Sequence, residues 1–166
     1  MGEPARIYVD KQHPAAYHAQ LEVAKAVQQA TEAAGLFRRL VELLNIRVSQ
    51  LNRCAFCLDL HTREALAHGE TAQRVATLPA WRDTLLFDDR ERAALTLAES
   101  LTTLPSDRDQ DRDYADAATH LTPEQLSAVS WVVIAMNAFN RISIVSRHPV
   151  RPRHDAETVT TTRSIG

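Results

Sequence analysis

Residues 42–61 read ELLNIRVSQLNRCAFCLDLH, a stretch in which apolar residues recur at helical spacing. That spacing is typical of one face of an α-helix and not of a strand. We therefore expect one helix over 36–51 and a second over 54–68, which Gly69 would end. A turn near Asn52 would fold the two helices into a hairpin.

Helical signals continue on both sides of this hairpin, and strand signals are almost absent. An Ala-, Gln- and Glu-rich segment over 15–34 ends at Gly35, and a short helix is expected over 71–77. Asp88 can cap another helix, and the residues Thr122–Gln125 have the pattern that opens a long one. No segment alternates apolar and polar residues for more than about five positions. We therefore predict an all-α protein.

Two regions of the C-terminal half depart from the usual amphipathic pattern. Residues 105–114 are charged and poor in apolar side chains, which indicates a solvated connection or the start of an exposed helix. Residues 131–136 are apolar nearly all round, so we expect them to be deeply buried or shared with another subunit. Pro149 would stop this helix, and residues 151–166 offer little to bury. We expect one domain over 1–150, followed by a mobile tail or arm.

The composition is that of an ordinary globular protein. The chain has 166 residues, of which 45% are apolar, and a formal net charge of −2. A chain with this charge has no electrostatic basis for binding nucleic acid or an anionic membrane surface. We find no secretory signal and no uncharged apolar run of about 18 residues, the length of a membrane span. The sequence therefore predicts a soluble cytoplasmic protein with neither a nucleic-acid nor a membrane partner.

The sequence contains a C-x-x-C pair, Cys54 and Cys57, and His61 follows four residues after the second cysteine. In a helix these three side chains lie one above another on one face. One helical turn brings two sulfurs close enough to join, and a helix N-terminus favours the reactive thiolate. Helical side chains lean toward the N-terminus, so the imidazole of His61 can reach back to Cys57 and exchange a proton with it. This pattern predicts thiol redox chemistry.

A carboxylate, Glu42, lies twelve residues before Cys54, on the first helix of the predicted hairpin. The turn would bring this helix against the start of the cysteine helix. A carboxylate beside His61 would hold the ring in one orientation, as the third member of a catalytic triad does. The candidate catalytic residues are therefore Glu42, Cys54, Cys57 and His61.

The spacing of Glu42, Cys54-x-x-Cys57 and His61 resembles the signature of the AhpD-like alkylhydroperoxidases, within the carboxymuconolactone decarboxylase superfamily. Further segments are similar to that family, namely residues 49–54, 61–65, 78–95 and 137–141, together with Gly69. The likeness covers roughly residues 14–148.

This resemblance implies an all-α fold of about six to eight helices, assembled as a homotrimer or hexamer. It also implies reduction of an organic hydroperoxide or hydrogen peroxide through a Cys54–Cys57 disulfide, with Glu42 and His61 as a proton relay. An external dithiol must then restore the pair. We expect no cofactor and no resident metal. One position departs from the family: Phe56 stands where its best-characterised peroxidases carry a second His, which implies a shorter or water-mediated relay.

Several alternatives stay open from the sequence. Proximity to His61 favours Cys57 as the attacking cysteine, whereas the helix dipole favours Cys54. A cofactor-free decarboxylation of a lactone acid is a second possible reaction, although it has no use for two adjacent thiols. A zinc-stabilised module is a third, because Cys, His and Glu are all zinc ligands. Of the histidines outside the motif, His68 is expected as a cation at the end of its helix. Loop or surface positions are expected for the other five, namely His13, His18, His120, His148 and His154.

Overall fold

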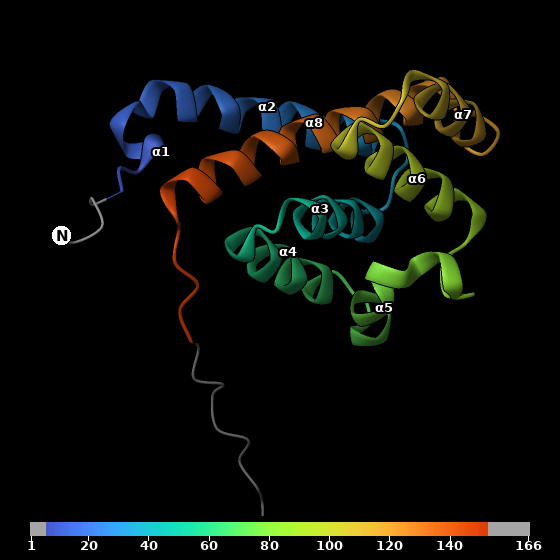
Figure 1. The fold of residues 1–166 in the computed structure, drawn as a ribbon, viewed down its shortest axis with the longest axis horizontal. Helices are drawn as coiled ribbons and strands as arrows, with labels where there is room; N and C mark the ends of the chain where they lie inside the picture. Colours follow the sequence, from blue (N-terminus) through green and yellow to red (C-terminus); the bar gives the residue numbers. More distant parts are fainter. Residues whose placement is uncertain (1–5, 153–166) are drawn as a thin grey trace, which may run out of the picture.

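The computed structural model describes residues 6–152, and every regular element in that range is a helix. The elements are α1 (Val9–Gln12), α2 (Pro14–Ala33), α3 (Arg38–Asn52), α4 (Ala55–Ala67), α5 (Ala72–Thr77), a 3-10 helix (Leu78–Asp83), α6 (Asp89–Thr103), α7 (Asp107–Ala118) and α8 (Pro123–Ser146) (Figure 1). The prediction of an all-α fold with about six to eight helices is confirmed. Of the expected tail, residues 153–166 lie outside the described range.

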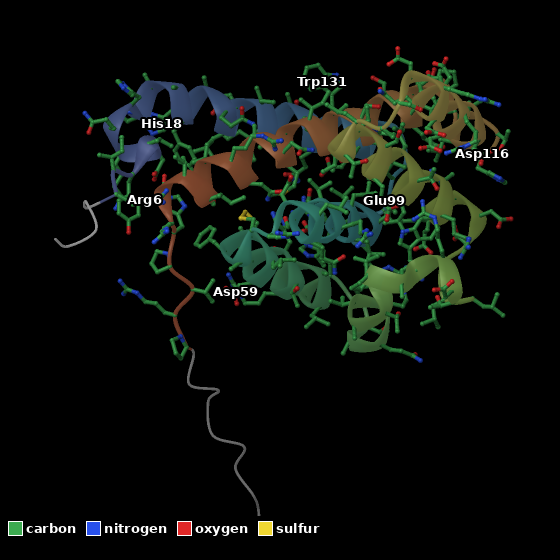
Figure 2. All side chains as sticks on the ribbon, viewed as in Figure 1. Arg6, His18, Asp59, Glu99, Asp116 and Trp131 are labelled. Carbon is green, nitrogen blue, oxygen red and sulfur yellow. A yellow bond between two sulfur atoms is a disulfide. The ribbon has the colours of Figure 1, made fainter. Side chains whose placement is uncertain are left out.

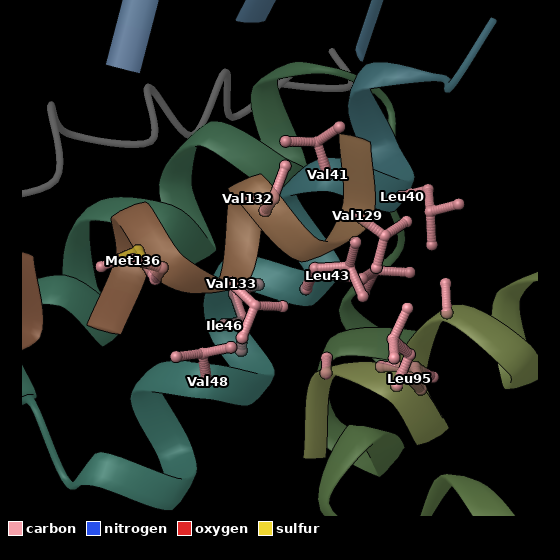
Figure 3. Close-up of a cluster of buried hydrophobic side chains, with 14 of the residues drawn as sticks. Leu40, Val41, Leu43, Ile46, Val48, Leu95, Val129, Val132, Val133 and Met136 are labelled. Carbon is pink, nitrogen blue, oxygen red and sulfur yellow. The ribbon is translucent and has the colours of Figure 1, made fainter. Parts of the chain in front are cut away.

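The hairpin of α3 and α4 is the centre of the arrangement. In Figure 1, α8 runs beside α2, and α3 and α4 lie beneath this pair. Helix α3 also packs against α6, so three other helices cover it. Its fully buried Leu43, Ile46 and Val48 meet Val129 and Val133 of α8 in one apolar cluster (Figure 3). Burial on this scale, about 1.5–3 kcal/mol for each large aliphatic side chain, holds the hairpin in place.

Reciprocal side-chain caps begin the two long helices of the C-terminal half. At α6, Asp88 accepts from the backbone N–H of Glu91 at 2.8 Å, and the Glu91 carboxylate accepts from the N–H of Asp88 at 3.0 Å. Thr122 and Gln125 form the same pair at α8, with contacts of 3.3 and 3.2 Å. Both helices therefore begin where the sequence predicts, because these caps satisfy N–H groups that a helix cannot pair internally.

The hairpin turn fixes the backbone of the first cysteine. Arg53 takes a left-handed conformation with φ of 58°, which ends α3. The backbone N–H of Cys54 then donates to the carbonyl of Ser49 at 3.0 Å. Cys54 is the N-cap of α4, so the predicted turn near Asn52 and the predicted start of the cysteine helix are both confirmed.

The two unusual regions form helices of different kinds. Residues 105–114 contain the start of an exposed helix, α7, in which only Ala117 is buried. Helix α8 buries one side, but Trp131 and Ile134 are 48% and 50% exposed in the single chain. Of the two expectations for 131–136, deep burial within the chain holds for only part of the segment, and sharing with another subunit stays a prediction. By length and composition alone, α8 could cross a membrane. Its buried side accounts for much of that apolar character.

Candidate active site

The two cysteines are joined by a disulfide at the N-terminal end of α4, seen as the yellow bond in Figure 2. Their Cα atoms are 5.4 Å apart, within the usual range for a disulfide. The sulfur of Cys54 accepts from the backbone N–H of Cys57 at 3.4 Å. Both residues are buried, with exposed fractions of 1% and 3%, so a reactant has to reach the sulfurs through a cavity.

A histidine–carboxylate pair links the two helices of the hairpin. Nδ1 of His61, on α4, lies 2.7 Å from Oε2 of Glu42, on α3. An ionised carboxylate only accepts hydrogen bonds, so Nδ1 is the nitrogen that donates and Nε2 remains for another partner. Glu42 has no exposed surface. The structure therefore brings together these two candidate residues, nineteen positions apart, in the orientation that a proton relay needs.

Glu42 is held in its charged form. Burial raises the pKa of its carboxyl group, but the hydrogen bond and charge of His61 lower it, as do the charge of Arg38 and a hydrogen bond from Asn45. The net result is a pKa below the ordinary value of 4.5. Nη2 of Arg38 lies 2.6 Å from Oε1 of Glu42, close enough for an ion pair but not aligned as a hydrogen bond. A buried carboxylate is therefore available to stabilise an imidazolium at His61.

A network of side-chain amides, one fully buried and two half-buried, supports the turn before Cys54. Nδ2 of Asn140, on α8, donates to Oγ of Ser49 at 3.0 Å, and Nδ2 of Asn52 donates to Oδ1 of Asn140 at 2.9 Å. The same Asn52 amide is 2.9 Å from Oδ1 of Asn137. Asn140 and Ser49 are fully buried. Since Ser49 also receives the N–H of Cys54, α8 fixes the position of the first cysteine through this network.

Two adjoining cavities meet at His61. One, of about 610 Å³, is lined by Cys57 and His61 together with Tyr17 and Phe139. The other, of about 520 Å³, lies along α2 and includes Arg38. His61, Leu21, Met136 and Phe139 line both cavities. The imidazole and the second cysteine therefore face one space, which has largely apolar walls.

Three residues near this centre could not be assigned from the sequence. Arg38 is the ion-pair partner of Glu42. The spacing of four residues along one helix is the sequence feature that could have indicated this pair. Asn140 gave no signal of burial, since an isolated Asn in a helix is more often at the surface. His148 lies in a loop directly after α8, as expected, but its side chain is only 14% exposed and lines the cavity that contains Cys57.

Metal ligation was the other chemistry that the sequence left open. Within residues 6–152, no group of three or more His, Cys, Asp and Glu side chains is arranged to hold a metal ion. The sulfurs are bonded to each other, and Glu42 is occupied by His61 and Arg38. The residues that could have been zinc ligands have other partners in this arrangement.

The sequence of this chain is similar to those of known proteins. The sequence pattern of the carboxymuconolactone decarboxylase family matches residues 14–100, which include all of the candidate residues. The uncharacterized protein YdfG of Bacillus subtilis is 38% identical over 124 residues, which are 75% of this chain and 84% of YdfG. The uncharacterized protein YnjA of Escherichia coli is 26% identical over 101 residues, covering 61% of this chain and 55% of YnjA.

A solved structure extends the similarity to most of the fold. It is a protein of unknown function from Agrobacterium tumefaciens that has been proposed to be the antioxidant defence protein AhpD. The two structures superpose with a TM-score of 0.79 at 29% sequence identity. The match covers 89% of this chain and 99% of that one. The similarity therefore extends well beyond the helical hairpin.

Proposed function

Because the chain belongs to the carboxymuconolactone decarboxylase family and has an AhpD-like fold, we propose that it is a thiol-dependent peroxidase. Its working centre is the Cys54–Cys57 pair, with His61 and Glu42 as the proton relay. The observation that carries this proposal is the pair of the buried Glu42 with His61, whose imidazole lines the same cavity as Cys57. A passive structural disulfide would have no use for such a pair.

The first step is attack of Cys57 on the peroxide. His61 takes the thiol proton of Cys57, and the thiolate attacks the terminal oxygen of the peroxide, which breaks the O–O bond. Cys57 becomes a sulfenic acid, and the departing alkoxide or hydroxide receives the proton from His61. Glu42 stabilises the imidazolium between these two transfers.

The second step closes the disulfide. The thiol of Cys54 attacks the sulfenic sulfur of Cys57, and one water molecule is released. An external dithiol then reduces the disulfide by exchange, which returns both thiols. No resident cofactor or metal takes part, because sulfur carries both electrons.

The cavity favours a peroxide with an apolar group. Leu21, Met136 and Phe139 line it together with His61, and they can contact a carbon chain while the peroxide group lies near the sulfur. Hydrogen peroxide would also enter but would gain none of these contacts. We infer that an organic hydroperoxide is the better substrate.

The assembly and the place of action are parts of the same proposal. Trp131 and Ile134 form an exposed apolar side of α8, which a second copy of the chain would cover in a homotrimer or hexamer. The chain would act in the cytoplasm, where a dithiol carrier can keep the cysteines reduced.

The experiment that tests the function is a thiol titration. The reduced protein receives one equivalent of cumene hydroperoxide, and free thiols are counted before and after. We expect the loss of two thiols per chain, with one alcohol formed for each peroxide consumed. The Cys54→Ser, Cys57→Ser double variant is the control for direct reaction of the peroxide with other residues. Retention of both thiols by the wild-type chain would reject the peroxidase.

A further inference from the structure

A second polar cluster lies beside the disulfide, where α1 meets the end of α8. Nε2 of His148, just after α8, lies 3.1 Å from Oδ1 of Asp10 on α1. Nδ1 of the same ring lies 3.3 Å from Oγ of Ser143 on α8. The carboxylate can only accept, so Nε2 carries a proton, and Nδ1 accepts from the Ser143 hydroxyl.

Local backbone structure sets this cluster in place. Arg147 takes a left-handed conformation with φ of 48° and ends α8, and the N–H of His148 donates to the carbonyl of Ser143 at 3.1 Å. The N–H of Val9 donates to Oγ of Ser146 at 3.1 Å, which brings the start of α1 and its Asp10 alongside. The end of one helix and the start of another thus form the cluster together.

Two aromatic rings hold the imidazole against the cysteine motif. Tyr8 stacks on His148 with ring centroids 5.3 Å apart. Phe56, which lies between the two cysteines in sequence, meets the same ring edge-on at 5.3 Å. The imidazole is therefore fixed beside the turn that carries Cys54 and Cys57.

The two cysteines line different cavities, and the imidazoles that line each cavity also differ. Cys57 lines the large cavity with both His61 and His148. Cys54 lines a separate hollow of about 330 Å³, whose walls include Ser143 and His148 but neither His61 nor Glu42. Ser143 and the second imidazole thus share this hollow with Cys54, and the Ser143 hydroxyl contacts the imidazole.

We propose that Asp10, His148 and Ser143 form a second proton relay of this site, which serves Cys54 as Glu42 and His61 serve Cys57. The proposal rests on the proposed function for its place in the reaction. It concerns the second step, in which Cys54 must lose a proton before it attacks.

The proton transfers and bond changes of this step need only Cys54, Cys57 and the residues of the second relay. The proton leaves Sγ of Cys54 for Oγ of Ser143, whose own proton passes to Nδ1 of His148. The new S–S bond forms as the S–O bond of the Cys57 sulfenic acid breaks, and the leaving hydroxide takes the proton back and departs as water. The sulfenic sulfur is reduced and the Cys54 sulfur is oxidised, so no further oxidant is needed.

The cluster has the same order of groups as a serine hydrolase triad, but hydrolysis does not fit its surroundings. Ser143 lies in the last turns of α8, where backbone N–H groups are used within the helix and the free groups are carbonyls. An oxyanion needs N–H donors, and the end of a helix opposes negative charge. Within the described part of the chain, Ser143 therefore lacks what an acyl-transfer nucleophile requires.

The test measures each thiol separately in the reduced protein. In the Cys57→Ser background Cys54 is the remaining thiol, and in the Cys54→Ser background it is Cys57. Alkylation by iodoacetamide is followed across a pH series, with His148→Gln, His61→Gln and the exposed control His120→Gln in each background. The charged or titratable groups around the His148 ring come from every element packed against it. They are Tyr8 before α1, Asp10 and Lys11 of α1, Tyr17 of α2, Arg53 at the hairpin turn, His61 of α4, and Arg147 and Arg151 after α8.

We expect His148→Gln to slow alkylation of Cys54 at neutral pH about tenfold. The reason is that a midpoint of the alkylation–pH curve higher by one pH unit means about tenfold less thiolate at neutral pH. Alkylation of Cys57 should stay within about twofold, and His61→Gln should give the reverse pattern. Asp10→Asn leaves the ring in place and should give a smaller effect of the same kind. Equal slowing of both thiols, or no change at Cys54, would overturn the second relay.

The same variants separate this proposal from the peroxidase itself. In the chain with both cysteines, His148→Gln should slow closure of the disulfide more than the first oxidation and accumulate sulfenic acid, which dimedone traps and mass spectrometry counts. If the wild-type chain consumes no peroxide, the proposed function fails while the alkylation result still decides the relay.

Discussion

Nδ1 of His61 lies 2.7 Å from Oε2 of Glu42, across the interface of two helices, and the Glu42 carboxylate has no exposed surface. Removing one charge from such a site leaves the other member of the pair without its partner, and this effect is larger than any change in packing. Glu42 can therefore be tested by a change that preserves its size.

Glu42→Gln should slow peroxide-driven disulfide formation by about 10²-fold, because an amide cannot stabilise the imidazolium. The side chain keeps its volume, so the helical content of the protein should not change. Stopped-flow loss of thiols under excess hydroperoxide measures the rate, and far-ultraviolet circular dichroism checks the fold. A rate within about twofold of wild type would mean that the carboxylate has only a structural role.

His61→Ala should reduce the same rate by roughly 10²–10⁴-fold, the range typical for loss of a general base. The exposed His120→Ala is the matched control and should react at the wild-type rate. If the two variants react equally fast, the cysteines are activated by another group.

Acid should destabilise the protein partly through Glu99. Burial raises the pKa of Glu99, but hydrogen bonds from Trp81 and Arg82, and the charge and hydrogen bond of Arg47, lower it below 4.5. Nε1 of Trp81 and Nε of Arg47 lie 2.8 and 2.7 Å from Oε1 (Figure 2 labels Glu99). The unfolded chain then binds more protons between the two pKa values, so the stabilisation is present above about pH 4.5 and is lost as the pH falls.

Urea unfolding across this acid range provides the measurement. Glu99→Gln should lower the free energy of unfolding at neutral pH and flatten its fall between neutral and acid pH. Glu22→Gln, which removes an exposed carboxylate paired with Lys25, is the matched control. If the free energy of unfolding of Glu99→Gln falls with pH as steeply as that of the wild type, the acid sensitivity comes from other carboxylates.

Much of this fold follows from local sequence signals. The capping residues Asp88 and Thr122 fix helix starts, and the hairpin turn at Asn52 follows from helical spacing on either side of it. The approach of Glu42 to His61 could also be predicted, because a hairpin has few ways to pair its two faces. These features depend on residues that are close along the chain.

Long-range contacts could not be predicted in the same way. Asn140 binds Ser49, 91 positions away, and Asp10 binds His148 across 138 positions. Neither pair has a sequence pattern, because each depends on how α8 lies across α3 and α1. The exposed side of α8 at Trp131 is a further case, since periodicity shows apolar surface but not what covers it.

Asn140→Ala should cost about 1–3 kcal/mol of unfolding free energy, because it removes the donor to Ser49 and the acceptor of Asn52 in a dry environment. Asn137→Ala, at a less buried position of the same helix, should cost less. Chemical denaturation of the oxidised chains gives both values. Equal losses would show that burial of Asn140 is not what makes this network important.

The roles of the two cysteines give the last prediction. Cys57 shares its cavity with His61, whereas Cys54 lines a different hollow, so Cys57 should attack the peroxide and Cys54 should resolve the product. Cys54→Ser should still allow one oxidation of Cys57 to sulfenic acid but block turnover, because no thiol remains to condense with it. Cys57→Ser should lose the first oxidation as well.

Dimedone labelling of each variant after one equivalent of hydroperoxide, followed by mass spectrometry, separates these cases. The helix N-terminus favours the opposite assignment, since Cys54 is the N-cap of α4 and its sulfur already accepts an N–H there. If Cys57→Ser is labelled at Cys54 and Cys54→Ser is not labelled, the dipole outweighs the neighbouring imidazole and the two roles are reversed. If neither variant is labelled and both still consume peroxide as fast as wild type, the cysteines are not the peroxidatic groups.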